Sequence, residues 1–234
     1  MGVTVLYLVS ATSPNIIIDV CDLIGNKIPT NVAKWSFEIK LFRENPHSMG
    51  SEAAAANAAV SQHIPGARPV PSNFLHTLIF ATNPKETVCL VKGVGTALTG
   101  PFDQMLQTKL QSLWQLRQFV RGEGTAFELD NGAFWVRLGN MTLQGNFRGL
   151  LIEIEASKLE TFWEGSEDPP GSDVTKSPAF RKIKPVLDLL TAQGSPLHGA
   201  GGRVIVGPSQ LVTRTKPFTR VETAWQYAEA LENR

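Results

Sequence analysis

Apolar and polar residues alternate along this chain with two different periods, and the pattern predicts a mixture of strands and helices. A run that is apolar on both faces at 3–8 predicts a buried strand, and strict alternation over 35–41 predicts a half-buried strand. Two apolar runs at 74–81 and 86–92 flank a sequence typical of a turn at 83–85, so we expect them to form a hairpin.

Capping signals mark the expected start of two helices, one near each end of the chain. Ser13 followed by Pro14 is typical of an N-cap and a first helical position, and the apolar repeat that follows stops at Gly25. Near the C-terminus, Thr219 and Glu222 have the spacing of a capping box. The apolar face expected for this last helix consists of Val221, Trp225, Ala228 and Leu231.

Two further helices are expected between these ends. The spacing over 104–119 predicts a helix whose apolar face consists of Leu106, Leu110, Leu113 and Trp114. We interpret Leu110, Leu113 and Trp114 as a scaffold motif that fixes the helix to the sheet. A second, shorter helix is expected over 180–190.

The strongest local signal is a hairpin at 125–138, where Asn131-Gly132 separates two alternating apolar runs. With these two residues as the loop, Leu129 faces Phe134, and the pairing continues outward to Ala126 opposite Arg137. One face then carries Phe127, Leu129, Phe134 and Val136, and the other carries Glu128, Asp130, Trp135 and Arg137.

These elements predict an α+β fold in which an antiparallel sheet closes, or nearly closes, into a β-barrel with flanking helices. The chain has 234 residues, and we interpret 1–234 as a single domain. Segments at about 43–73 and 164–217 are rich in Pro, Gly and small polar residues, so we expect insertions of low order there.

Composition excludes several classes of protein. With 22 Lys and Arg against 21 Asp and Glu, the formal net charge is +1, so no global field attracts nucleic acid or an anionic membrane. No apolar run approaches the ~18 residues that a spanning helix needs. The first residues lack the basic region of a secretory signal, and Leu6 breaks the myristoylation pattern. Two cysteines, Cys21 and Cys89, indicate a reducing compartment, the cytosol or the nucleus.

Motifs for catalysis are scarce. The sequence has no nucleophile elbow and no P-loop, and the HGAGG run at 198–202 has no nucleophile to serve. Its four histidines, His47, His63, His76 and His198, are scattered without metal-ligand spacing. We therefore expect no catalytic residue, no metal and no cofactor.

Paired carboxylates are the one acidic pattern that could carry chemistry. Glu153 and Glu155 lie two residues apart on one face of an expected strand, as do Glu128 and Asp130. Such pairs could hold a divalent metal in a tunnel-type phosphohydrolase, which is the alternative function considered for this chain. The favoured interpretation is the solvent face of amphipathic strands, because Asp and Glu are mostly exposed.

Trp135 stands out as a large aromatic residue on the polar face of the 125–138 hairpin. Together with Arg137 and Glu128 it has the composition of a protein–protein contact, so these three residues are the predicted partner interface. The competing interpretation, equally weighted, is that a helix of the same chain covers this face.

Several stretches read together resemble one protein family. KLQSLWQLRQ at 109–118, DNGAFWVRLGN at 130–140 and NFRGLLIEIE at 146–155 resemble the fungal type of Mediator complex subunit 20, a head-module family also called suppressor of RNA polymerase B. The beginning, MGVTVLYLVSATS, and the AWQYAEALE run near the end are similar to the same family. The resemblance does not extend over 43–73 or 160–217.

The resemblance implies a fold, a role and partners. It implies a β-barrel with packed helices, forming a heterodimer with the similarly folded Mediator subunit 18 and held to the head module by a helix of subunit 8. The implied role is that of a nuclear coactivator in RNA polymerase II transcription initiation, with contacts to the TATA-binding protein and the polymerase. It implies no catalytic residue. The near-zero net charge and the lack of an apolar span predict no direct binding to nucleic acid or membrane.

Overall fold

The structure is a computed structural model that describes residues 2–10, 13–27, 29–45, 73–166, 173–208 and 216–232, with a few single positions between 48 and 62. The chain forms two compact units, Met1–Phe37 with Val120–Arg234 as unit 1 and Glu38–Phe119 as unit 2. Two long strands, β2 (Asn31–Glu44) and β6 (Trp114–Leu129), contribute residues to both.

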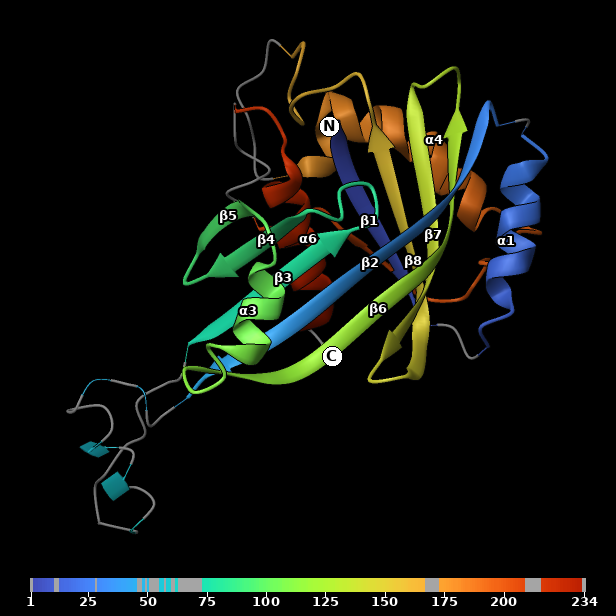
Figure 1. Ribbon diagram of the computed structural model, residues 1–234. Coiled ribbons are helices and arrows are strands. Elements are labelled where there is room, and N and C mark those ends of the chain that lie inside the picture. Colours follow the sequence, from blue (N-terminus) through green and yellow to red (C-terminus); the bar gives the residue numbers. More distant parts are fainter. Residues whose placement is uncertain are drawn as a thin grey trace. The chain divides into compact units, whose positions relative to one another are not determined.

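Unit 1 is built on the strand order β2-β6-β7-β8-β1-β9. The pairs β6–β7, β7–β8, β8–β1 and β1–β9 are antiparallel, and β7, β8 and β1 lie side by side in Figure 1. The strands that complete this order are β1 (Val3–Val9), β7 (Phe134–Leu143), β8 (Asn146–Ala156) and β9 (Gly202–Ile205).

The expected hairpin at 125–138 is confirmed together with its register. Leu129 pairs with Phe134, Glu128 with Trp135 and Ala126 with Arg137. Asn131 and Gly132 adopt φ values of 51° and 80°, the left-handed conformations that a two-residue turn of this type requires. The sorting of side chains is confirmed as well, because Phe127, Leu129 and Val136 all enter the core.

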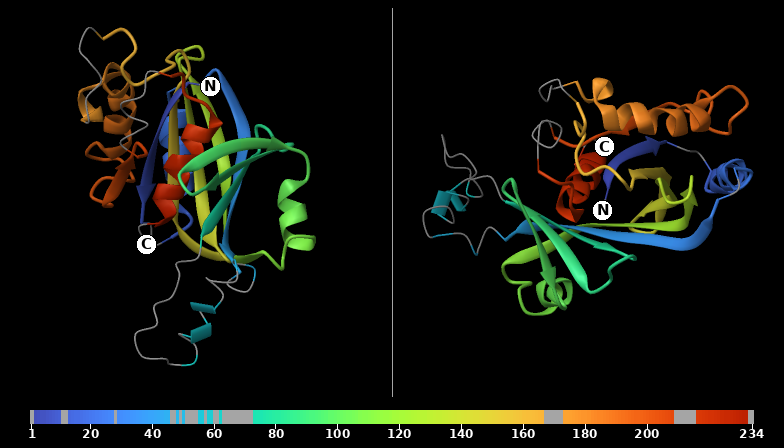
Figure 2. Two further views of the ribbon diagram at one scale, coloured as in Figure 1. Left: turned by 90° about the vertical axis from the view of Figure 1, so that its left-hand side faces the viewer. Right: turned by 90° about the horizontal axis from the view of Figure 1, so that it is seen from above.

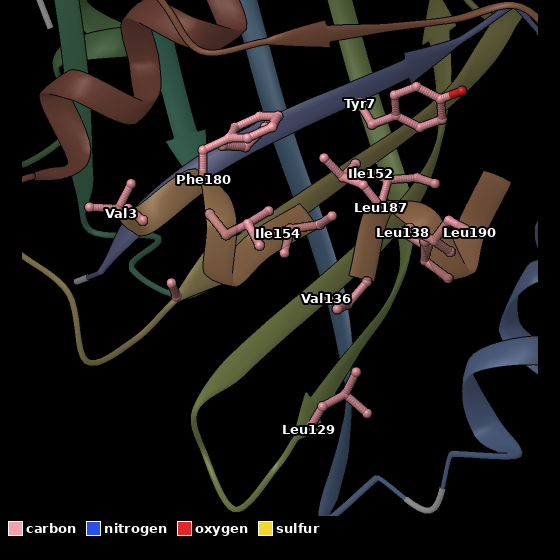
Figure 3. Close-up of a cluster of buried hydrophobic side chains, with 14 of the residues drawn as sticks. Val3, Tyr7, Leu129, Val136, Leu138, Ile152, Ile154, Phe180, Leu187 and Leu190 are labelled. Carbon is pink, nitrogen blue, oxygen red and sulfur yellow. The ribbon is translucent and has the colours of Figure 1, made fainter. Parts of the chain in front are cut away.

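One face of the unit 1 sheet packs against α4 (Pro178–Thr191). Odd-numbered residues of β1 and even-numbered residues of β8 point to this side, as period-2 alternation requires. Figure 3 shows Tyr7, Ile152 and Ile154 meeting Phe180 and Leu187 of the helix. The same core also contains Val20 and Ile24 of α1 (Ile16–Gly25). Burying such side chains contributes about 1.5–3 kcal/mol each.

The opposite face of β1 and β8 is covered by α6 (Arg220–Glu232), so the two helices lie on the two sides of these strands (Figure 2). This face buries Leu6, Leu8 and Leu151 together with several polar groups that bond to α6. The Thr4 hydroxyl lies 3.1 Å from that of Thr223 and donates to Oε1 of Gln226 at 2.6 Å, and the Gln226 amide donates to the Thr4 carbonyl at 2.6 Å.

Unit 2 contains the expected hairpin of β3 (Phe74–Phe80) and β4 (Glu86–Val91), to which β5 (Val94–Thr99) is added. A short helix, α3 (Phe102–Thr108), places Leu106 in a small core with Phe42, Leu75 and Cys89. Asp103 on this helix accepts from Lys40 at 2.5 Å and from Thr77 at 3.3 Å, which ties α3 to two strands.

The predicted helix over 104–119 is wrong for most of its length. Helix α3 ends at Thr108, a turn follows in which the Trp114 N–H donates to the Leu110 carbonyl at 2.9 Å, and Trp114 then starts strand β6. Leu110, Leu113 and Trp114 therefore share no helical face, and Leu113 is 42% exposed. The apolar spacing here fits both periods, and pairing within the sheet decides between them.

Two capping details are also corrected. Ser13 does not cap α1, because Asn15 holds the N-cap position and the Ser13 hydroxyl instead accepts from the Asn15 N–H at 3.3 Å. For α6, the box of Thr219 and Glu222 is confirmed, since Glu222 accepts from the Thr219 N–H at 2.8 Å. The predicted apolar face of α6 is wrong except for Ala228, since the residues of α6 that are buried are Glu222, Thr223, Ala224, Gln226, Tyr227, Ala228 and Ala230.

Closure of the sheet into a barrel is not confirmed, because the strand order in the described residues has two ends, β5 and β9. The α+β class and the antiparallel sheet are confirmed. Most of the predicted insertion at 43–73 lies outside the described residues. The segment at 164–217 contains the short η2 (Val174–Lys176), α4 and β9, so the low order expected there does not hold for 173–208.

Leu106→Ala and Leu113→Ala test the revised placement of the 102–119 segment. Because Leu106 is 1% exposed, its truncation should lower the free energy of unfolding by about 2–5 kcal/mol. Because Leu113 is 42% exposed, its truncation should cost about 0.5 kcal/mol or less. Urea denaturation of both variants measures this difference. Equal losses, or a larger loss for Leu113→Ala, would contradict the placement.

Candidate functional site

Four charged or phenolic side chains form a buried network on the face of the unit 1 sheet that α6 covers. Arg137 on β7 pairs directly opposite Glu153 on β8, and Glu155 lies two residues further on the same face. One nitrogen of the Arg137 guanidinium, Nη1, donates to Oε1 of Glu153, and Nη2 donates to Oε2 of Glu155 at 2.7 Å. A single guanidinium therefore spans both carboxylates.

The remaining oxygen of each carboxylate also receives a donor. The Tyr227 hydroxyl on α6 donates to Oε2 of Glu153 at 2.5 Å, and the backbone N–H of Gly2 donates to Oε1 of Glu155 at 2.7 Å. All four carboxylate oxygens are thus satisfied inside the fold. This matters because a buried charge without partners is strongly destabilising.

Tyr227 reaches Glu153 because the capped helix α6 is held by packing as well as by hydrogen bonds. The Tyr227 ring meets the Phe37 ring of β2 edge-on, and the two ring centroids are 4.8 Å apart. The Phe37 ring itself fits only because residue 122 is glycine, since a Cβ there would lie 2.0 Å from the ring. The position of the phenol thus depends on a small residue on β6.

Burial and neighbouring charges shift two pKa values in the network. Burial disfavours the charged Arg137 guanidinium, but Glu153 and Glu155 outweigh this effect, so the pKa of Arg137 is raised. The pKa of Tyr227 is raised well above its usual value, first by burial and then by the charge of Glu153. Both groups therefore keep their protons, as the hydrogen bonds they donate require.

The network corrects the interpretation of the paired carboxylates. Glu153 is 2% exposed and Glu155 is 6% exposed, so the solvent-face interpretation is wrong for this pair. The metal-site alternative finds no support either, because every oxygen of the pair is already occupied by a donor. Within the described residues no group of three or more His, Cys, Asp or Glu is placed to hold a metal. In the other pair, Asp130 is exposed and Glu128 is half-buried.

The three predicted interface residues lie close together, but their environments differ. Arg137 belongs to the network, and its side chain is only 11% exposed. Trp135 and Glu128 are half-buried and directly paired across the β6–β7 hairpin. The Trp135 ring lies under the Arg137 guanidinium, with 5.6 Å between the ring centroid and Cζ, a cation–π contact. The Arg137 part of this face is linked to α6 through Glu153, which accepts from both Arg137 and Tyr227.

The cysteine and histidine side chains that the structure describes do not form a reactive centre. Burial, and secondarily Asp103, raises the pKa of the buried Cys89 thiol to about 12. Burial also raises the pKa of the half-buried Cys21. His76 is buried in β3, and Nδ1 of His198 lies 3.2 Å from the Thr191 carbonyl, while His47 and His63 lie outside the described residues.

Sequence reasoning missed Tyr227, Gly2 and the burial of Glu153 and Glu155. One signal was available: the acidic pair follows Leu150-Leu151-Ile152, a run that is apolar on both faces and typical of a strand covered on both sides. Carboxylates in such a strand need internal partners. The identity of Tyr227 as a partner could not be inferred, because it lies 74 residues away in the chain.

Comparison with known proteins places this chain in a family. The family model described as "TATA-binding related factor (TRF) of subunit 20 of Mediator complex" matches residues 1–232. The chain belongs to the Mediator subunit 20 family. A member from Scheffersomyces stipitis, "Mediator of RNA polymerase II transcription subunit 20", is 33% identical over 190 residues, which cover 67% of this chain and 76% of the relative.

A second member of the subunit 20 family, from Yarrowia lipolytica, is 37% identical over 147 residues, covering 55% of this chain and 65% of the relative. Among solved structures, a chain of the Schizosaccharomyces pombe Mediator head module is similar with a TM-score of 0.39 at 11% identity, over 81% of this chain and 95% of that chain. Family membership makes this chain a non-catalytic coactivator subunit of Mediator in RNA polymerase II transcription.

None of the helices that the structure describes is long and apolar enough to cross a membrane.

Arg137→Met tests the energetic role of the network. The variant keeps most of the side-chain volume but leaves two buried carboxylates without their cation, so the free energy of unfolding should fall by about 3–5 kcal/mol. In the triple variant Arg137→Met, Glu153→Gln, Glu155→Gln no charge remains, and Tyr227 and Gly2 still have acceptors. We expect it to lose less than the single variant in urea denaturation. A single variant as stable as the unchanged protein would refute this role.

The pKa of Cys89 predicts slow thiol chemistry in the folded protein. In a Cys21→Ser variant at pH 8, Ellman's reagent should react with Cys89 at least about a hundredfold more slowly than in denaturant, because little thiolate is present and the thiol is buried. Above pH 9 the unfolded chain loses this proton before the folded one does, so the contribution of Cys89 to stability should fall as pH rises toward 12. Rapid labelling of the folded variant would contradict the assignment.

Proposed function

We propose that this chain forms a heterodimer with Mediator subunit 18 and acts within the head module of Mediator, in the nucleus. In this role a helix of subunit 8 attaches the pair to the module, and the pair supports initiation by RNA polymerase II through contacts with the TATA-binding protein and the polymerase. The observation that carries the proposal is the match of the subunit 20 family over residues 1–232, which includes both units.

The geometry of the polar face agrees with an assembly role rather than a catalytic one. Its ionisable groups are engaged with one another, since Arg137, Glu153, Glu155 and Tyr227 satisfy each other's hydrogen bonds. A catalytic site would present at least one such group to a substrate. This supports an assembly role, in which the protein acts by binding other proteins at its outer surface.

Of the three predicted interface residues, Trp135 and Glu128 remain proposed contacts with a partner. Both are half-buried, so each keeps accessible surface, and a partly exposed tryptophan beside an arginine has the character of a binding hot spot. Arg137 is assigned an internal role instead, because both Nη nitrogens of its guanidinium are bound to carboxylates.

Co-expression with subunit 18 from the same organism tests the heterodimer. We expect the two full-length chains to elute together at a 1:1 ratio in size-exclusion chromatography, since obligate partners of one module share a large apolar interface. A head-module subunit other than 8 or 18, expressed in the same way, serves as the control and should not co-elute by itself. Separate elution of subunit 18 from a folded subunit 20-family chain would contradict the proposal.

A further inference from the structure

Strand β5 is the terminal strand of the sheet in unit 2, with β4 as its only neighbour in the described part of the chain (Figure 1). All six of its residues, VGTALT, are uncharged. Four of them are exposed, and Val94 is 64% exposed. Natural proteins usually protect such an edge with charged side chains, proline or a bulge, because a bare edge pairs with other chains.

The outward-pointing backbone groups of β5 can be identified from the hairpin that joins it to β4. The turn at Lys92 and Gly93 has φ values of 50° and 77°, so Val91 and Val94 close a two-residue loop and exchange hydrogen bonds. The bond from the Gly100 N–H to the Lys85 carbonyl, 3.1 Å, continues the same alternation at the far end.

It follows that the N–H and C=O groups of Gly95, Ala97 and Thr99 point away from β4. Within the residues that the structure describes, these groups have no hydrogen-bond partner. They form a ladder of donors and acceptors at the spacing of a strand, and only an extended backbone matches this spacing. Gly95 has no side chain, so another backbone can approach closely at this position.

The other terminal strand, β9 in unit 1, differs in each of these respects. It has four residues, begins at Gly202 and carries Arg203, so it is short and charged.

Exposed apolar side chains are unevenly distributed between the two units. Of the eight large apolar residues that are exposed in the described part of the chain, five belong to unit 2: Phe74, Val94, Met105, Leu113 and Leu116.

We propose that β5 is a docking edge on which subunit 18 adds an extended, uncharged segment as a further strand, bonded to the backbone of Gly95, Ala97 and Thr99. This inference rests on the proposed heterodimer and specifies its contact. The partner segment carries no charge at its centre, because β5 offers no counter-ion for a charge that becomes desolvated there. Affinity comes from main-chain hydrogen bonds, and side chains on the two faces add selectivity.

Ala97→Pro tests the docking edge through the backbone. Proline at this position removes an outward N–H and no bond to β4, so edge-strand geometry tolerates it. Ala97→Val is the matched control, because it keeps the N–H and suits a strand. With full-length proteins and purified subunit 18, we expect the Kd of Ala97→Pro to rise about tenfold or more, while the Kd of Ala97→Val changes by less than about twofold.

Hydrogen exchange of the unsubstituted protein gives a second measurement that does not depend on the folding of a variant. The amides of Gly95, Ala97 and Thr99 should exchange rapidly in the free chain and become protected in the complex. Unchanged binding by Ala97→Pro, equal weakening by Ala97→Val, or amides already protected in the free chain would each overturn the docking edge. Failure of the unsubstituted chain to bind subunit 18 would instead overturn the heterodimer itself.

Discussion

The arrangement of unit 1 depends on one interaction, the ion pairs that the Arg137 guanidinium forms with both Glu153 and Glu155. Three buried charges on neighbouring strands are tolerated only when each finds its partner, so the register between β7 and β8 admits no slip. A shift by one residue would turn both carboxylates toward the apolar face under α4. The same contact fixes the acceptor that Tyr227 requires, and thereby the position of α6.

The two faces of the β1–β8 layer have different roles: packing on one face stabilises the fold, and hydrogen bonds on the other fix the position of α6. Under α4, aliphatic and aromatic side chains pack without directional bonds, and such packing supplies most of the free energy of folding. Under α6, hydrogen bonds from Thr4, Gln226, Tyr227 and the carboxylates are directional. Exchange of α6 for another helix, or its translation by one turn, would leave these groups unsatisfied, so the polar face specifies one arrangement.

The sequence predicted the features that depend on neighbours in the chain. The Asn131-Gly132 hairpin, the β3–β4 hairpin and the capping box at Thr219 all follow from local turn and cap chemistry. The segment after Thr108 was predicted wrongly, because its apolar spacing fits a helix and a strand equally well and only pairing in the sheet decides. The buried carboxylates were missed because their partners come from Gly2 and Tyr227, far apart in the sequence.

The hydrogen bonds of Arg137, Glu153, Glu155 and Tyr227 are completed within the chain, which restricts where this member of the subunit 20 family can bind other proteins. A side chain whose hydrogen bonds are completed internally gains nothing from a partner and loses its own contacts when it is disturbed, so Arg137 and its carboxylates contribute to assembly only through the shape they maintain. Half-buried Trp135 retains a free part of its ring. The backbone of β5 differs from both, because its outward groups have no hydrogen-bond partner within the residues that the structure describes, and an extended strand has the donors and acceptors that match them.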